Sequence, residues 1–274
     1  MSFIHDTVAL LEGAGMQLHS TQIKEIEFHE DGTQTHTLKA SLISGSKVSI
    51  EKNPRAKFLL IFSLFDFWID SNSPHLEGKS YRQKYLGMPS DSDHLLIIKE
   101  IFRVSKVLRN TLVHNPSLFT FKDDSLAISY QFKNAEFSIV ISHGKLNFLY
   151  SLIVMLVTES IRNEYFYAVV RFIYMDVFNS IRNFSDDFNF PLKKDLSGLM
   201  LKSVMRIRLK NTKYKIIQGC VKIIPPQEVI RDLESYQGLD FLIHIDDETC
   251  LIPLESLDNE LSLLASDIAK WKEV

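Results

Sequence analysis

The chain has 274 residues, of which 45% are hydrophobic and 24% are charged, and its formal net charge is −3 at pH 7. This composition is typical of a globular protein and excludes both a disordered chain and a globally basic nucleic-acid-binding protein. Any contact with RNA must therefore come from a local cluster of cations. The length suits one large domain or two small ones.

The cysteines, the N-terminal residues and the apolar runs indicate in which cellular compartment the protein is expected. Cys220 and Cys250 do not make a disulfide framework, and no CxxC motif is present, so a reducing, cytoplasmic setting is expected. The N-terminus has no basic stretch followed by an apolar run, which predicts no signal peptide. The most apolar run, Leu146 to Val157, is shorter than the roughly 20 residues that span a bilayer, so a buried helix and no membrane partner are expected.

Residues 1–53 predict a small leading region with a short helix and a hairpin. The helix is expected over residues 3–11. Residues 23–28 alternate apolar and polar side chains, and Asp31-Gly32 is a turn signal, so a second strand is expected over residues 37–43.

Residues 54–195 carry the strongest helical patterns. Residues 58–69 are apolar on nearly every face and predict a buried helix, in a chain whose many Phe residues suit a helix-bundle core. The stretch 71–92 predicts a loop with at most a short helix. Asp91-Ser92-Asp93 can cap a helix that should end at about Leu112 or Val113, because Pro116 disfavours helical geometry in the residue before it.

The rest of this region predicts a β-hairpin followed by more helix. Short strands are expected over 119–121, 126–132 and 137–142, with turns at Asp123-Asp124 and Lys133-Asn134. A long helical pattern then covers residues 146–184 and could be split near Asn163.

From residue 196 the pattern changes to short strands. Strands are expected over 204–209, 214–224, 239–245 and 249–252, a short helix over 227–236, and a terminal helix over 257–271. The predicted fold class is therefore α+β, with a mainly helical bundle that carries a β-hairpin insertion. Three regions are expected: 1–53, the helical domain 54–195, and a C-terminal α/β region 196–274.

The most informative motif is Arg109-Asn110-Thr111-Leu112-Val113-His114, which lies where the amphipathic helix pattern ends. A guanidinium and an imidazole a few residues apart can bind a phosphate and move a proton without metal or cofactor. RNA supplies its own nucleophile, the 2′-OH beside the scissile phosphate. An Arg and a His could thus cleave RNA and leave a 2′,3′-cyclic phosphate and a 5′-hydroxyl.

The motif resembles the Arg-(four to six residues)-His motif of the HEPN superfamily, in which a polar residue such as Asn110 often follows the Arg. The resemblance is centred on residues 108–115. It implies a metal-independent endoribonuclease in which Arg109 and His114 are catalytic and Asn110 supports them. It also implies a homodimer with a composite active site, and a toxin or phage-defence role with an antitoxin or regulatory protein as partner. The expected hairpin at 119–142 departs from a minimal HEPN bundle.

Helix geometry constrains how the pair could act. Five residues at about 100° each place Arg109 and His114 roughly 140° apart on an ideal helix. The helix must therefore end or distort before His114, or both residues must face a second subunit.

Less specific explanations of the motif stay open. Arg109 could be a surface cation that neutralises the helix C-terminus, and His114 an ordinary C-terminal cap. The domain could also be a HEPN-like fold without catalysis that only dimerises or binds a partner.

A second cluster of cations lies between residues 202 and 222, in a stretch without Asp or Glu. It could guide an RNA backbone or meet an acidic partner. The alternative is a solvated strand face or edge, where lysine discourages aggregation. The candidate RNA-binding residues are Lys202, Arg206, Arg208, Lys210, Lys213 and Lys215.

No pattern predicts a metal or an organic cofactor. The other histidines are scattered, without HExxH or a His/Cys ligand spacing, and the motifs GxSxG, GxxxxGK[ST] and GxGxxG are absent. The acidic pairs Asp186-Asp187 and Asp246-Asp247 are interpreted as turns. No cofactor and no metal site are therefore expected.

Overall fold

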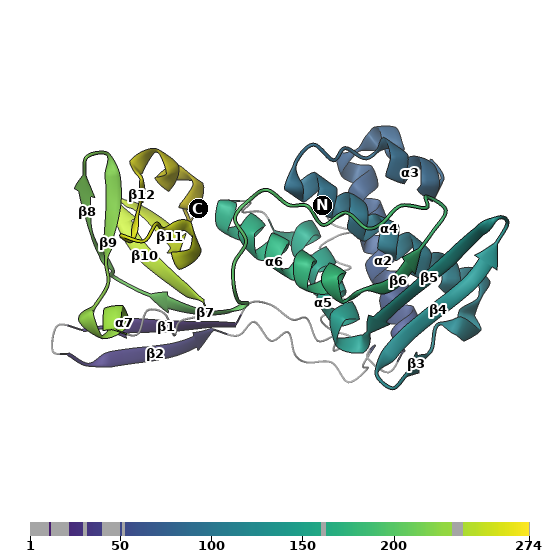
Figure 1. The fold of residues 1–274 in the computed structure, drawn as a ribbon, viewed down its shortest axis with the longest axis horizontal. Coiled ribbons are helices and arrows are strands. Elements are labelled where there is room, and N and C mark those ends of the chain that lie inside the picture. The colour runs from purple at the N-terminus through teal and green to yellow at the C-terminus, as the bar shows by residue number, and fades with distance from the viewer. Residues whose placement is uncertain are drawn as a thin grey trace. The chain divides into compact units, whose positions relative to one another are not determined.

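The computed structural model of the chain describes residues 11, 22–29, 32–39, 50, 53–159, 163–231 and 238–273. It divides into two compact units, and the boundary between them crosses one helix after Phe172. The first unit takes its residues from 1–19, 42–159 and 173–197, and the second from 20–41, 160–172 and 198–274 (Figure 1). The helix expected over residues 3–11 lies outside the described residues, apart from Leu11.

The protein is α+β, but the expectation of a mainly helical protein is wrong. Strands from both ends and the middle of the chain form three sheets, with five, three and four strands. Local periodicity could show single strands, but it could not show that distant strands pair into a mixed sheet.

The first unit combines long helices with a four-stranded antiparallel sheet of order β3-β4-β5-β6. Its helices are α2 (Pro54–Asn72), η2 (Pro74–Leu76), α3 (Tyr81–Gly87), α4 (Asp93–His114), η3 (Pro116–Leu118) and α5 (His143–Thr158), with the C-terminal part of α6 (Glu164–Ser180). Its strands are β3 (Phe121–Lys122), β4 (Ser125–Phe132), β5 (Ala135–Ser142) and β6 (Arg182–Ser185).

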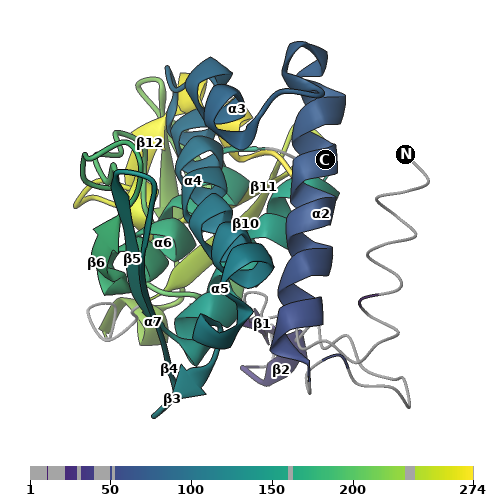
Figure 2. The same ribbon diagram turned by 90° about the vertical axis from the view of Figure 1, so that its right-hand side faces the viewer.

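Aromatic side chains fill the helical core of this unit, as the composition predicts. Helix α2 packs against α4 and α5 (Figure 2). The rings of Phe62 and Phe102 stack with centroids 6.2 Å apart, and Phe58 and Phe65 are fully buried. Burial of each such side chain contributes about 1.5–3 kcal/mol, so this core fixes α4 firmly between its neighbours.

The β4–β5 hairpin is confirmed, and so are both predicted turns, Asp123-Asp124 between β3 and β4 and Lys133-Asn134 between β4 and β5. Asp123, Asp124 and Lys133 all have positive φ angles, of 47°, 60° and 55°. Aspartate tolerates this left-handed region better than most residues, and the Lys133-Asn134 turn joins Phe132 to its partner Ala135. The helical pattern over 146–184 is indeed split near Asn163, whose side-chain oxygen accepts a 2.9 Å hydrogen bond from the N–H of Phe166.

The second unit is built on a five-stranded sheet of order β11-β10-β7-β1-β2, in which β7 lies parallel to β1 and to β10. A three-stranded sheet, β12-β9-β8, accompanies it. The elements are β1 (Gln22–Phe28), β2 (Gln34–Lys39), β7 (Met205–Leu209), β8 (Lys213–Ile217), β9 (Cys220–Ile224), α7 (Gln227–Arg231), β10 (Leu239–Ile245), β11 (Glu248–Pro253), η5 (Leu254–Ser256), β12 (Ser262–Leu264) and η6 (Ala265–Trp271).

Two sequence predictions in this unit need correction. The strand expected over 214–224 is a hairpin of two strands, β8 and β9, because Gly219 adopts a positive φ of 78° and turns the chain. The terminal helix expected over 257–271 is instead β12 followed by a 3-10 helix, because residues 262–264 pair with β9. The strand pair around Asp246-Asp247 is confirmed.

Candidate functional site

Helix α4 carries Arg109, Asn110 and His114, and it continues to His114 itself. Asn115 caps the helix, its N–H donating a 2.7 Å hydrogen bond to the carbonyl of Thr111, and Pro116 begins η3. The expected end at Leu112 or Val113 is therefore one to two residues early. Because the helix is unbroken, Arg109 and His114 lie roughly 140° apart and do not share a face within one chain.

Arg109 lies beside a groove of about 340 Å³ between α2 and α4, which also contains Asp66, Asp70 and Val113. Its guanidinium lies 5.0 Å from the centre of the Tyr81 ring, and Nη1 donates a 3.3 Å hydrogen bond to Oδ1 of Asn110. Among the described residues, no carboxylate lies within ion-pair distance of it. A half-buried guanidinium of this kind can receive an anion.

The two nearby carboxylates are held by another cation. Lys84 Nζ lies 2.7 Å from a carboxylate oxygen of Asp66 and 2.7 Å from one of Asp70. Burial raises the pKa of the Asp66 carboxyl above its usual value, against the hydrogen bond from Lys84 and the charge of Arg109. Both carboxylates are therefore paired with Lys84, and neither forms an ion pair with Arg109.

His114 is exposed on another side of α4 and faces the tip of the β4–β5 hairpin. Its ring lies nearly parallel to that of Phe132, with an interplanar angle of 8° and centroids 6.2 Å apart. Asn110, one turn earlier, lines the same side, since residues four apart share a helix face. Asn110 and His114 thus lie on one side of α4, while Arg109, which donates its hydrogen bond to Asn110, lies in the neighbouring groove.

A second cavity, here called the hairpin groove, has a volume of about 600 Å³ and lies between α4 and the β4–β5 turn. It is lined by Ser80, Tyr81, Arg82, Lys106, Asn110, Phe132, Lys133, Asn134, Ala135, Phe137, Asp187 and Asn189. Its charged side chains are three cations and one carboxylate, a net charge of +2. Sequence reasoning missed this groove because its walls come from four separate segments, and no local pattern links them.

Asp187 holds two of these cations. It forms an ion pair with Lys106, and its Oδ2 lies 2.6 Å from Arg82 Nη1. Burial alone would raise the pKa of Asp187, but the hydrogen bonds from Lys106 and Arg82 lower it below its usual value. The Asp186-Asp187 pair is therefore more than the turn expected from sequence.

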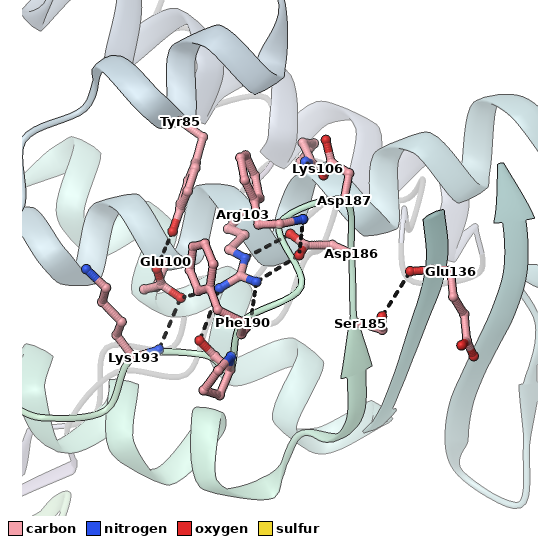
Figure 3. Close-up of polar contacts among 12 residues, drawn as sticks. Tyr85, Glu100, Arg103, Lys106, Glu136, Ser185, Asp186, Asp187, Phe190 and Lys193 are labelled. Carbon is pink, nitrogen blue, oxygen red and sulfur yellow. Dashed lines mark hydrogen bonds and ion pairs between the residues drawn. The ribbon is translucent and has the colours of Figure 1, made fainter. Parts of the chain in front are cut away.

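The loop that carries Asp187 is fixed to α4 by a buried ion network (Figure 3). Arg103 is completely buried, and its Nε and Nη2 each donate a 2.8 Å hydrogen bond to Asp186. Nη2 also donates a 2.6 Å hydrogen bond to the carbonyl of Phe190. On the other side, the Tyr85 hydroxyl donates a 2.8 Å hydrogen bond to Glu100, and burial together with that carboxylate raises the pKa of Tyr85.

Replacing Asp187 with asparagine should destabilise the protein by about 1–3 kcal/mol at pH 7, because Lys106 loses its carboxylate. The pKa of Asp187 is lowered in the folded state, so its charge stabilises the fold above the unfolded value of about 3.9 and this contribution is lost as the pH falls through the folded value. Urea denaturation of both proteins between pH 7 and pH 3 measures this. The stability difference should be constant down to about pH 5 and then shrink. A difference that is the same at every pH would contradict the assignment.

The second cluster of candidate RNA-binding cations is partly neutralised in the second unit. Arg206 is 1% exposed and is bound by Asp240 and Glu255, with Nη1 lying 2.6 Å from Glu255 Oε1. Arg208 Nη1 lies 3.4 Å from both Glu25 and Glu273, and Lys210 Nζ lies 2.9 Å from Glu25. Arg206 is therefore not a surface cation. The remaining candidates, Lys202, Lys213 and Lys215, are exposed, the last two on the edge strand β8.

Within the described ranges, no three His, Cys, Asp or Glu side chains gather closely enough to hold a metal ion. In the same part of the chain, every helix is too short or too polar to cross a bilayer.

Comparison with known proteins adds no relative. No protein-family model, no curated protein and no solved structure matches this chain. The HEPN resemblance therefore depends on residues 108–115 and on their position at the end of α4. Any functional assignment must be argued from the side chains themselves.

Proposed function

We propose that this chain is a metal-independent endoribonuclease of the HEPN type that acts as a symmetric dimer. The observation that carries the proposal is the end of α4. There an exposed imidazole, His114, lies one to two turns from a half-buried guanidinium, Arg109, which has no carboxylate within ion-pair distance among the described residues. A guanidinium can bind phosphate oxygens through paired hydrogen bonds, and an exposed imidazole can accept and donate a proton.

The reaction needs only these groups and the RNA. A base removes the proton of the 2′-OH, and the 2′ oxygen then bonds to phosphorus while the bond from phosphorus to the 5′ oxygen breaks. An acid gives the leaving 5′ oxygen its proton, and Arg109 stabilises the charge on the non-bridging oxygens. The products are a 2′,3′-cyclic phosphate and a 5′-hydroxyl.

In a symmetric dimer, an Arg109 and a His114 from different copies of the chain could meet in one site. Within one chain Arg109 and His114 lie on different faces of α4, so a guanidinium from one copy would act with an imidazole from the other. Three apolar side chains around the Arg109 groove, Leu59, Phe67 and Val113, are 37%, 43% and 47% exposed. They offer a surface that a second copy could cover.

The biological setting in this proposal follows from the resemblance. It is that of a cytoplasmic toxin or phage-defence effector, controlled by an antitoxin or regulatory protein. Asn110 supports the pair, since its side-chain oxygen accepts the hydrogen bond from Arg109.

Incubation of the purified protein with end-labelled RNA in EDTA tests the proposal. We expect cleavage, with fragments that end in a 2′,3′-cyclic phosphate, and no cleavage of a DNA strand of the same sequence, which lacks the 2′-OH. Intact RNA after removal of any co-purified protein would overturn the proposal. Loss of cleavage on addition of EDTA would overturn the metal-independent chemistry.

A non-catalytic interaction module is the second candidate, and the unbroken α4 favours it. If Arg109 and His114 never meet, the exposed apolar side chains near Arg109 would serve only to bind a second copy or another protein. A protein that is dimeric by light scattering but leaves RNA intact in the same assay would support this candidate.

A further inference from the structure

We infer that the hairpin groove holds an unpaired nucleobase of the RNA substrate, stacked on Phe132, next to the bond that is cleaved. This inference rests on the proposed ribonuclease function and names the part of the RNA that the site recognises. It concerns residues that the motif does not contain.

Phe132 connects the groove to the candidate catalytic histidine. Its ring is 51% exposed, lines the groove, and lies nearly parallel to the ring of His114, with an interplanar angle of 8°. A planar group that stacks on Phe132 would therefore lie within one nucleotide of the imidazole. Phe132 has ring contacts with His114 and with Nζ of Lys133, and about half of the residue remains open to solvent.

The other walls suit a base better than an apolar ligand. Tyr81 and Phe137 add aromatic surface, while Asn110 and Asn134 present amide groups that can donate and accept hydrogen bonds. A volume of about 600 Å³ is within the range of small-molecule sites and leaves room for a base with its sugar. Bases splayed from single-stranded RNA are recognised by this combination of aromatic stacking and polar edges.

The charges around the groove favour a polyanion. Lys133 is exposed at the hairpin tip, and its Nζ lies 5.6 Å from the centre of the Phe132 ring, so it could contact the phosphate of a base stacked there. Arg82 is half-exposed and remains able to share a phosphate oxygen, although it is paired with Asp187. With a net charge of +2, the groove complements an RNA backbone rather than a basic or neutral peptide.

Fluorescence anisotropy with a short labelled 2′-O-methyl RNA of mixed sequence tests the inference on the intact protein. The methyl group blocks the nucleophile, so binding is measured without cleavage. We expect Phe132→Ala to weaken binding of the single strand by about 5–150-fold, the effect of losing one stacked base, while Phe132→Trp preserves it. The corresponding duplex should bind more weakly than the single strand, since its bases are not free to enter the groove.

A pair of lysine variants provides the matched control. Lys133→Ala should weaken binding, whereas Lys122→Ala, at the opposite end of the hairpin, should leave it unchanged. Circular dichroism and thermal melting show that each variant is folded.

If Phe132→Ala binds the single strand as tightly as wild type, the inference is overturned, even if the protein cleaves RNA. If single strands bind through Phe132 but wild type cleaves nothing, the groove stands as an RNA site and the ribonuclease proposal fails. If the protein binds an acidic peptide but does not bind the single-stranded RNA, the RNA assignment is overturned.

Discussion

Replacing either Arg109 or His114 with alanine is expected to lower the rate of RNA cleavage by about 10²–10⁴-fold, because each change removes the proton-transfer group or the charge that stabilises the phosphate. Rates of wild type and both variants on one labelled RNA measure the effect. Both side chains are partly or fully exposed, so neither change should destabilise the fold by more than about 0.5 kcal/mol. A variant that keeps the wild-type rate would remove its residue from the mechanism.

The arrangement of the two residues makes a sharper prediction for mixed dimers. If Arg109 of one copy works with His114 of the other, a dimer of one Arg109→Ala chain and one His114→Ala chain keeps one intact pair of two. Random mixing of the two inactive variants should then restore about one quarter of wild-type activity, since about half of the dimers are mixed. If both residues act from one chain, mixing restores nothing.

A second mixture controls for subunit exchange. Wild type mixed equally with the double variant Arg109→Ala/His114→Ala should keep about one quarter of the activity if the pair forms between chains, and about one half if it forms within a chain. Both mixtures are read in the same assay, and mass spectrometry of differentially tagged chains confirms that exchange has occurred. Recovery in the first mixture together with one half in the second would contradict both arrangements.

Sequence predicted the local elements well where a single segment determines them. The apolar run at 58–69 lies within α2, α4 begins at Asp93 as the sequence predicts, and Asp123-Asp124 turns the chain between β3 and β4. In each case the deciding interactions are between residues a few positions apart, so periodicity and turn chemistry suffice.

Long-range pairing could not be predicted in the same way. Strand β1 pairs in parallel with β7, which lies almost two hundred residues later in the chain. The alternation of side chains in either strand does not show with which other strand it pairs. The cations near residue 206 look free in sequence because no acid lies near them, yet Asp240 and Glu255 neutralise Arg206 from other segments. A cluster of like charges in one segment is therefore weak support for a binding surface.

The candidate site was predicted in part for the same reason. The motif and its position at a helix end depend on one segment, so the sequence alone predicts them. The orientation of His114 toward Phe132, and the groove beyond it, depend on where the hairpin packs on α4. The helix end itself was placed too early because Pro116 restricts Asn115 but leaves His114 free to stay helical.

Replacing Arg103 with methionine is expected to destabilise the protein by about 3–5 kcal/mol, because it leaves the carboxylate of Asp186 buried without its cation. Arg103 and Asp186 are 0% and 1% exposed, so water cannot take the place of the lost hydrogen bonds. Urea denaturation at pH 7 measures the change. Arg82→Met is the matched control: this arginine also pairs with an aspartate of the same loop but is half-exposed, and its loss should cost about 0–1 kcal/mol.

A double-mutant cycle separates the unpaired charge from lost packing. If the cost of Arg103→Met comes mainly from the stranded carboxylate, then Arg103→Met/Asp186→Asn should be less destabilised than the sum of the two single variants by about 1–3 kcal/mol. Equal values would mean that the cost lies in other contacts of Arg103, which include the buried carboxylate of Glu100 and the ring of Phe190, whose centre is 4.1 Å from the guanidinium. Because Asp187 follows Asp186 directly, a loosened loop should also release Arg82 and Lys106 into the hairpin groove. Arg103→Lys keeps the positive charge but loses the forked contact with Asp186. It should therefore change the affinity for single-stranded RNA, although the side chain of Arg103 is completely buried.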